Sequence, residues 1–232
     1  MAISHVQGLH NANAGSGTSI AQTGSVVGNG NAVLVFVSWD NGSSPTVTVD
    51  DDKGNTYTSL DGNISDGVNN EGGQTFVRGN ITNGPSTITA HFSVGSGSRV
   101  IIWDEYSGVQ AATNPTDGHT TNFQNPAPAT TDGIVSTNIT TTQGNDLIWG
   151  ATSLNTASGT ITQGTGFTPR VTDTTTGCAF CMTEDEIQSS AGAVQTTFTT
   201  NTSQQTYCFV VALKAAAAAA ATPMLVTLMG VT

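Results

Sequence analysis

The sequence predicts an all-β protein folded as an antiparallel β-sandwich. Only 9% of its 232 residues are charged, against about 25% in ordinary soluble domains, so little is available to cover exposed helix faces. The 27 glycines and many short polar residues supply turns, whereas Thr and Val favour half-buried strands. Roughly a dozen strand-like segments recur every 8–15 residues or so, which is the spacing of a sandwich.

The stretch of residues 99–109 is expected to form the strand around which the others wrap. Four bulky apolar residues precede Asp104 and Glu105, and Tyr106 follows them before a Ser-Gly stop. Successive side chains of a strand point to opposite faces, so Asp104 and Tyr106 share one face and Glu105 takes the other. One carboxylate must therefore lie on the more buried side, where it needs hydrogen-bond donors or a cation.

Two other segments, residues 31–39 and 146–151, carry apolar runs typical of strands covered on both faces. Residues 111–132, with three of the seven prolines, are expected to form a long surface loop. Further strands are predicted at residues 3–7, 19–21, 46–49, 56–58, 75–78, 86–92, 134–140, 167–171, 179–187, 193–199 and 206–213.

The charge balance excludes some classes of partner. Five basic residues against 16 acidic ones give a net charge of −11, which argues against binding nucleic acid or an anionic membrane surface. No apolar run approaches the roughly 20 residues of a membrane span. The first residues lack the basic start and apolar core of a signal peptide, so we expect either assembly in a cytoplasm or a leader that has been removed.

The C-terminal residues differ in kind from the body. We expect a sandwich domain over residues 1–214 and an extension over residues 215–232, where seven alanines and Thr-Pro precede an apolar segment. Seven uncapped alanines are too few for a stable helix. The extension is either a frayed linker and tail, or an arm whose apolar strand adds to an open sheet edge of this molecule or of a neighbour in a homo-oligomer. The interface residues of such an arm are Met224, Leu225, Val226, Leu228 and Met229.

Two acidic groups are candidate calcium sites, because hard cations prefer clustered carboxylate and carbonyl oxygens on a tight turn. Asp50, Asp51 and Asp52 precede a Lys-Gly-Asn turn; the alternative is a solvated acidic turn. Asp104 and Glu105 form the second candidate, and its alternative is a carboxylate bonded to backbone amides. No other cofactor is indicated.

The three cysteines, Cys178, Cys181 and Cys208, are too few and odd in number for a closed disulfide framework. Cys178 and Cys181 have the Cys-x-x-Cys spacing of a zinc ligand pair, but no second pair accompanies them. Small buried thiols on strands are the simpler interpretation.

Catalytic signatures are weak. Glu184 and Glu186 would face the same side of a strand, about 6.5–7 Å apart at their α-carbons, which is compatible with a retaining glycosidase. Sugar sites, however, usually bring exposed aromatic residues, and Trp39, Trp103 and Trp149 all lie in apolar runs typical of a core. The one local acid–histidine pairing, Asp117-Gly118-His119, falls in the expected long loop and indicates a surface histidine.

An ordered set of short motifs carries a resemblance to known proteins. The set comprises Gly54-Asn55-Thr56-Tyr57-Thr58, Glu105-Tyr106-Ser107-Gly108-Val109, Gly144-Asn145-Asp146-Leu147, Gly164-x-Gly166-Phe167-Thr168 and Val211-Ala212-Leu213-Lys214. Over about residues 3–214 the chain resembles jelly-roll-like β-sandwich modules of bacterial secreted proteins and tailed-phage particle proteins. The resemblance implies that fold and an adhesive or structural role, and it supplies no catalytic residues.

Three functions therefore stand as hypotheses. The first is a non-enzymatic structural protein of a phage virion, such as a capsid-decorating, fibre or tail-associated subunit, that contacts other virion subunits. The second is a secreted module that binds glycans or assembles into a surface filament. The third, and least favoured, is a glycan-cleaving enzyme.

Overall fold

The computed structural model describes residues 2–40, 45–61, 64–65, 71–155, 158–175 and 177–217, and for residues 64–65 only the backbone. These residues form antiparallel β-sheets and no α-helix, so the predicted all-β sandwich class is confirmed. Across these ranges no helix is long and apolar enough to span a membrane. The strands are β1 (Ser4–Asn13), β2 (Gly17–Thr23), β3 (Ala32–Asp40), β4 (Val47–Asp51), β5 (Thr58–Ser59), β6 (Ile64–Ser65), β7 (Gly72–Arg78), β8 (Thr87–Ser96), β9 (Ser98–Ser107), β10 (Thr116–Gln124), β11 (Ile134–Val135), β12 (Ile139–Thr140), β13 (Asp146–Leu154), β14 (Ile161–Gln163), β15 (Thr168–Asp173), β16 (Phe180–Gln188), β17 (Ala193–Val194), β18 (Thr197–Thr200) and β19 (Thr206–Leu213).

The two halves of the chain repeat one strand order. In residues 2–109, the first half, the large sheet runs β1-β9-β3-β7-β5, and a small sheet runs β2-β8-β4. In residues 110–217, the second half, the large sheet runs β10-β19-β13-β16-β15, and a small sheet runs β11-β18-β14. Each large sheet thus begins with the first strand of its half, followed by the last strand. The sequence analysis did not anticipate this internal duplication.

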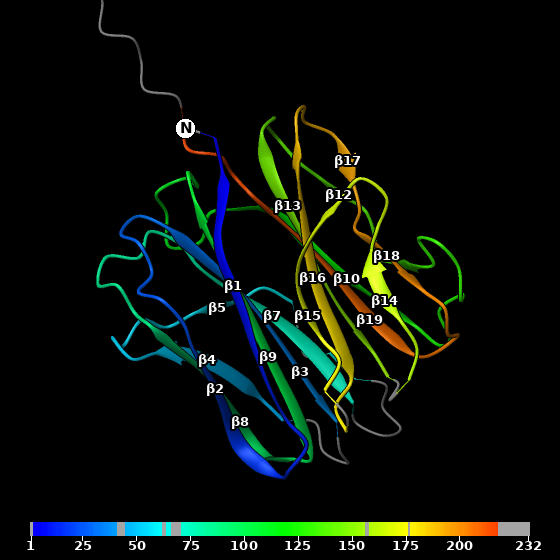
Figure 1. Cartoon of the computed structure of the whole chain (residues 1–232). Coiled ribbons are helices and arrows are strands. Elements are labelled where there is room, and N and C mark those ends of the chain that lie inside the picture. Colours follow the sequence, from blue (N-terminus) through cyan, green and yellow to red (C-terminus); the bar gives the residue numbers. More distant parts are fainter. Residues whose placement is uncertain are drawn as a thin grey trace, which may run out of the picture.

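The sheets stack in four layers, with the two large sheets in the middle (Figure 1). Among the described residues, the central hydrophobic cluster, which we call the shared core, draws ten buried residues from each half. A second cluster fills the space between the large and small sheets of the first half, and two smaller clusters do the same in the second half. The expected β body therefore consists of two sandwiches packed back to back.

This stacking explains the strands that the sequence predicts to be covered on both faces. In β9, Val100 and Ile102 belong to the shared core, while Ile101 and Trp103 belong to the core of the first half. Strand β3 divides its side chains in the same way. A large sheet with a sandwich partner on one face and a second sandwich on the other has no solvent-facing side at its centre.

One region contradicts the sequence analysis. Residues 111–132 are not a loop throughout, because β10 occupies Thr116–Gln124 and pairs with β19 along the edge of the second large sheet. All nine residues of β10 are partly exposed, and Phe123 is its one large apolar residue. The sequence of this segment therefore shows no alternation of apolar and polar residues. Backbone pairing with β19, and not local propensity, forms this strand.

The root of the C-terminal extension is fixed on the body. Ala215 forms a bridge with Val109, and the backbone N–H of Ala216 donates to the carbonyl of Gly108 at 2.9 Å. The Ala215 N–H also approaches the carboxylate of Asp146 at 3.3 Å. The apolar segment with Met224, Leu225, Val226, Leu228 and Met229 lies outside the described residues, so the arm stays a prediction.

We predict that the shared core makes the two halves unfold together. Phe209 of β19 is fully buried there, with its ring centroid 5.4 Å from that of Phe36 in the other half. Phe209→Ala should lower the free energy of unfolding by about 3–5 kcal/mol, and Phe209→Leu by less, because leucine leaves a smaller cavity. Urea unfolding and calorimetry should show a single transition for each variant; two separate transitions for the wild type would contradict a shared core.

Candidate functional site

The first candidate site surrounds Asp104, which lies fully buried in the layer between the two large sheets. Its Oδ2 accepts a hydrogen bond from the indole N–H of Trp149, across the boundary between the halves, at 2.9 Å. Its Oδ1 lies 3.0 Å from Nε2 of His5, on the neighbouring strand β1. Both carboxylate oxygens therefore have partners, as a buried carboxylate requires.

A second carboxylate also joins the halves, but here the donor lies in the first half and the acceptor in the second. The hydroxyl of Tyr106, on β9, donates to Oδ2 of Asp185, on β16, at 2.6 Å. Arg170 holds the same carboxylate with two hydrogen bonds, from Nε at 2.7 Å and from Nη2 at 2.8 Å. Burial raises the pKa of Tyr106 well above its usual value, so the phenol keeps its proton and acts as a donor.

Gly8 makes this arrangement sterically feasible. It pairs with Asp104 in the β1–β9 ladder, and a Cβ atom there would lie 2.3 Å from Asp104 Oδ1 and 2.7 Å from Val171 of the second half. Any larger residue would push apart the two sheets or the His5–Asp104 pair.

We call Asp104, Tyr106, Trp149, Arg170 and Asp185, together with His5, the inter-half polar network.

Glu105 points to the other face of β9, as the alternation predicts, and is also fully buried. Its Oε1 accepts from the backbone N–H of Gly28 at 2.8 Å and from the side chain of Asn31 at 2.5 Å. Its Oε2 accepts from the side chain of Gln7 at 2.6 Å. Asp104 and Glu105 thus lie on opposite faces of one sheet, and each already has protein donors.

The acidic turn does not gather its carboxylates at one point. Asp51 is buried, Asp50 is half-buried, and Asp52 accepts backbone hydrogen bonds that lower its pKa. Their partners are Lys53, Asn55 and Tyr57 for Asp51, His91 for Asp50, and Ser86 and Thr87 for Asp52. Within the described ranges no three His, Cys, Asp or Glu side chains are grouped as metal ligands would be. Calcium binding stays a prediction, and it would require these donors to be displaced.

Glu184 and Glu186 lie on one face of β16, but they differ in environment. Glu184 is fully buried; its Oε2 accepts from the backbone N–H of Gly164 at 2.8 Å, and its Oε1 has no hydrogen-bond partner in the described structure. Burial raises the pKa of Glu184 to about 8 and also raises that of Glu186, which is half-buried. Neither residue lines any of the three cavities described below.

Asp117 and His119, the one local acid–histidine combination in the sequence, do not pair with each other. His119 lies on β10, not in a surface loop, and its Nδ1 is 2.8 Å from Asp61 of the first half. Asp61 raises the pKa of His119. Asp117 instead pairs with Lys214 at 3.1 Å and accepts hydrogen bonds from Thr142. Local spacing indicates neither partner, because strand pairing brings together residues that are distant in sequence.

The tryptophans, Cys181 and Cys208 lie where the simpler interpretations place them, whereas Cys178 is buried but lies between β15 and β16, not on a strand. Cys178, Cys181 and Cys208 are buried and unpaired. Burial raises the pKa of Cys181 and of Cys208, so these thiols are poor nucleophiles. The tryptophan side chains are at most 2% exposed, which confirms that they belong to the core and removes them as platforms for sugar rings.

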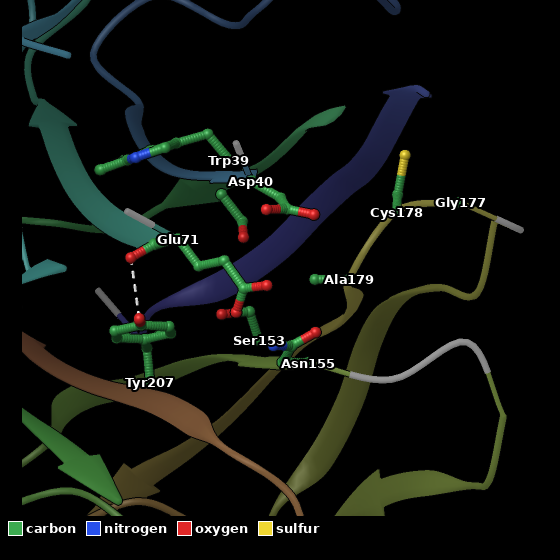
Figure 2. Close-up of a pocket in the computed structure, with 10 residues that line it drawn as sticks. Trp39, Asp40, Glu71, Ser153, Asn155, Gly177, Cys178, Ala179 and Tyr207 are labelled. Carbon is green, nitrogen blue, oxygen red and sulfur yellow. Dashed lines mark hydrogen bonds between the residues drawn. The ribbon is translucent and has the colours of Figure 1, made fainter. Parts of the chain in front are cut away.

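A cavity of about 180 Å³ opens at one end of the boundary between the halves. Figure 2 shows Asp40 and Glu71 of the first half facing Ser153 and Asn155 of the second, with the Cys178 thiol turned away. The hydroxyl of Tyr207 donates to the backbone carbonyl of Glu71 at 2.8 Å. These oxygen atoms are of the type that binds hard cations, but two carboxylates alone do not define a metal centre.

Two further cavities adjoin one another at the side of the molecule where the C-terminal extension is rooted. The larger, of about 610 Å³, is lined by Ala2, Ile3, Gln110, Gln143, Gly144, Asn145, Ile187 and residues 215–217. The smaller, of about 250 Å³, is lined by Ile3, Ser4, His5, Tyr106, Leu147, Arg170, Asp185 and Ile187. They share Ile3 and Ile187, and we refer to the pair as the terminal groove.

Comparison with known proteins assigns no function to these features. No protein-family model matches the chain, and no curated protein matches it at a significant level. The candidate function must therefore be argued from the geometry alone.

We predict that the inter-half polar network contributes measurably to stability. Tyr106→Phe removes the donor to Asp185 without changing the ring, and it should lower the free energy of unfolding by about 1.5–3 kcal/mol, the range for hydrogen bonds to charged groups. Tyr57→Phe is the matched control, because its hydroxyl reaches Asp51 at a longer 3.3 Å. Chemical denaturation should rank Tyr106→Phe as the more harmful change; an equal effect of the two would contradict the role given to the network.

We predict that Glu184 makes the protein less stable as the pH rises. The folded carboxyl has a pKa of about 8 against an ordinary value of 4.5, so between these pH values the unfolded chain releases a proton that the folded chain retains. The free energy of unfolding should then fall by up to a few kcal/mol across this window. Thermal melts of Glu184→Gln should match the wild type at pH 4 and exceed it at pH 8.5. Glu186→Gln, at the half-buried site, should show a smaller gain, and an unchanged pH profile in Glu184→Gln would refute the assignment.

Proposed function

We propose that the protein is a non-enzymatic structural subunit that acts through protein–protein contacts, as part of a phage virion in a capsid-decorating, fibre or tail-associated position. The observation that carries the proposal is that the buried carboxylates already have hydrogen-bond partners within the protein. Asp104 and Glu105 are bonded within the protein's own layers, and Asp185, although it lines the smaller cavity of the terminal groove, has both oxygens held by Tyr106 and Arg170. A site for bond-making chemistry instead needs a nucleophile or base that faces a cavity and can still meet a substrate.

The architecture supports the same proposal. A four-layer stack with one continuous shared core gives a body that resists deformation, which suits a subunit that must transmit contacts. The strand order of each half, β1-β9-β3-β7 with β2-β8-β4 and its counterpart in the second half, agrees with the jelly-roll topology implied by the resemblance. We therefore propose that the chain holds two jelly-roll units of the particle-protein type.

A homo-oligomer is part of the proposal. The net charge of −11 disfavours nucleic acid and anionic membranes as partners, and the apolar segment of residues 224–229 gains by burial in a neighbouring subunit.

We predict that the full chain self-associates. Sedimentation velocity from about 1 to 100 μM, a range that brackets micromolar interfaces, should show species larger than the monomer of 23.6 kDa, with the mass rising with concentration. The matched control is a chain with Leu225→Asp and Leu228→Asp, which places a carboxylate on each face of an extended segment and should reduce association. A chain that stays monomeric at every concentration would contradict the proposal.

Two other outcomes would favour the alternative functions. Binding on a glycan array that a calcium chelator abolishes would support a secreted glycan-binding module, with calcium as its cofactor. Glycan cleavage that is lost in Glu184→Gln would support an enzyme, and it would overturn the non-enzymatic assignment directly.

A further inference from the structure

We propose that the terminal groove receives the apolar segment of residues 224–229 from a second copy of this chain. The inference rests on the proposed self-assembling function and deepens it, because it names both the receiving surface and its occupant. The resulting contact would be an exchange of C-terminal arms between two bodies.

The terminal groove contains exposed apolar surface. Ile187 is one of the few large apolar side chains left exposed among the described residues, at 47%, and it lies on the wall shared by both cavities with Ile3. The alanines of residues 215–217 extend this wall. Exposed aliphatic surface inside a concavity is the usual mark of a binding site for an apolar partner.

Charge favours an uncharged occupant. Two molecules that each carry −11 repel one another, so a contact between copies is favoured where few unpaired carboxylates lie. The residues that line the larger cavity carry no charge and include the amide side chains of Gln110, Gln143 and Asn145. In the smaller cavity the Asp185 carboxylate is already paired with Arg170. Residues 215–232 also carry no charged side chain. Amide groups can meet the backbone of an extended segment while aliphatic side chains meet Ile187.

The occupant lies close in sequence to the groove. The described chain ends at Ala217, on the wall of the larger cavity, and six residues separate it from Met224. Fully extended, that spacer reaches about 20 Å. A neighbouring body can therefore receive the segment only if the two grooves lie near each other, which predicts a compact reciprocal dimer.

A second copy explains the pattern better than the same chain does. The tract of residues 215–221 contains only alanine, and Thr222-Pro223 is the first pair with turn-forming chemistry. A hairpin turning there would place residue 228 opposite residue 217, and it would leave Met224, Leu225 and Val226 beside alanines beyond the groove. If two copies exchange their C-terminal arms, all of residues 224–229 can enter the terminal groove of the neighbouring copy.

The test uses full-length chains in a complementation design. Ile187→Asp blocks the groove but keeps the segment, whereas the chain with Leu225→Asp and Leu228→Asp keeps the groove but blocks the segment. Val94→Asp is the matched control for Ile187→Asp, because Val94 is similarly exposed at 43% but lies on β8, in the outer sheet of the first half. Circular dichroism checks that each variant is folded.

We expect Ile187→Asp to raise the dissociation constant for self-association at least about tenfold, the effect of losing one well-buried contact, while Val94→Asp stays near the wild type. Mixing the two blocked chains should restore a 1:1 dimer, detected by native mass spectrometry, because one intact groove and one intact segment remain.

An oligomer that survives Ile187→Asp would overturn the groove as the binding site but leave the proposed structural function standing. Failure of the mixture to associate would overturn exchange in favour of docking within one chain, and a wild type that never associates would overturn both proposals.

Discussion

The burial of two large sheets against each other is the constraint on which this structure depends. Each half alone is a sandwich whose large sheet would expose a full apolar face, because the strands carry bulky side chains on both sides. Packing the two large sheets together removes both faces from water at once, and apolar burial is the dominant favourable term in folding. The duplicated strand order is therefore more than a repeat of shape. Each half supplies the cover that the other requires.

The polar groups within that layer determine how the two sheets fit together. Asp104 and Asp185 lie among apolar side chains, where an unpaired carboxylate is very costly, and each takes a donor from the opposite half, Trp149 or Tyr106. A different alignment of the sheets would leave both carboxylates without those donors. Buried polar groups can fix how two apolar surfaces fit together, because only one alignment of these sheets supplies the donors from Trp149 and Tyr106. Gly8 contributes to the same alignment, because it leaves room for Asp104.

Part of this organisation could be predicted from the sequence, because alternation and apolar runs are local properties. The division of β9 into two faces, the doubly covered strand β3 and the buried tryptophans all follow from side-chain order along one strand. Strand β10 could not be predicted, since its polar residues are held by pairing with β19. The partner of His119 and the donors to Asp185 come from the other half of the chain, and no local spacing encodes such contacts. The duplication of the strand order could not be predicted for a related reason. The two halves share their strand order without an obvious repeat in their amino-acid sequences.

The low charge content connects the interior to the surface. A chain with five cationic side chains and 16 acidic ones cannot cover itself with balanced ion pairs, and Lys53, Arg170 and Lys214 already pair with aspartates of the same chain. Few cationic side chains are therefore left to form salt bridges between copies, and the remaining negative charge opposes their close approach. Uncharged surface is where such molecules can approach one another, and Ile187 is one exposed apolar side chain that lies beside the point where the chain leaves the body. In the assembly that we propose, the same composition that lets strands be buried on both faces therefore favours association through the C-terminal segment.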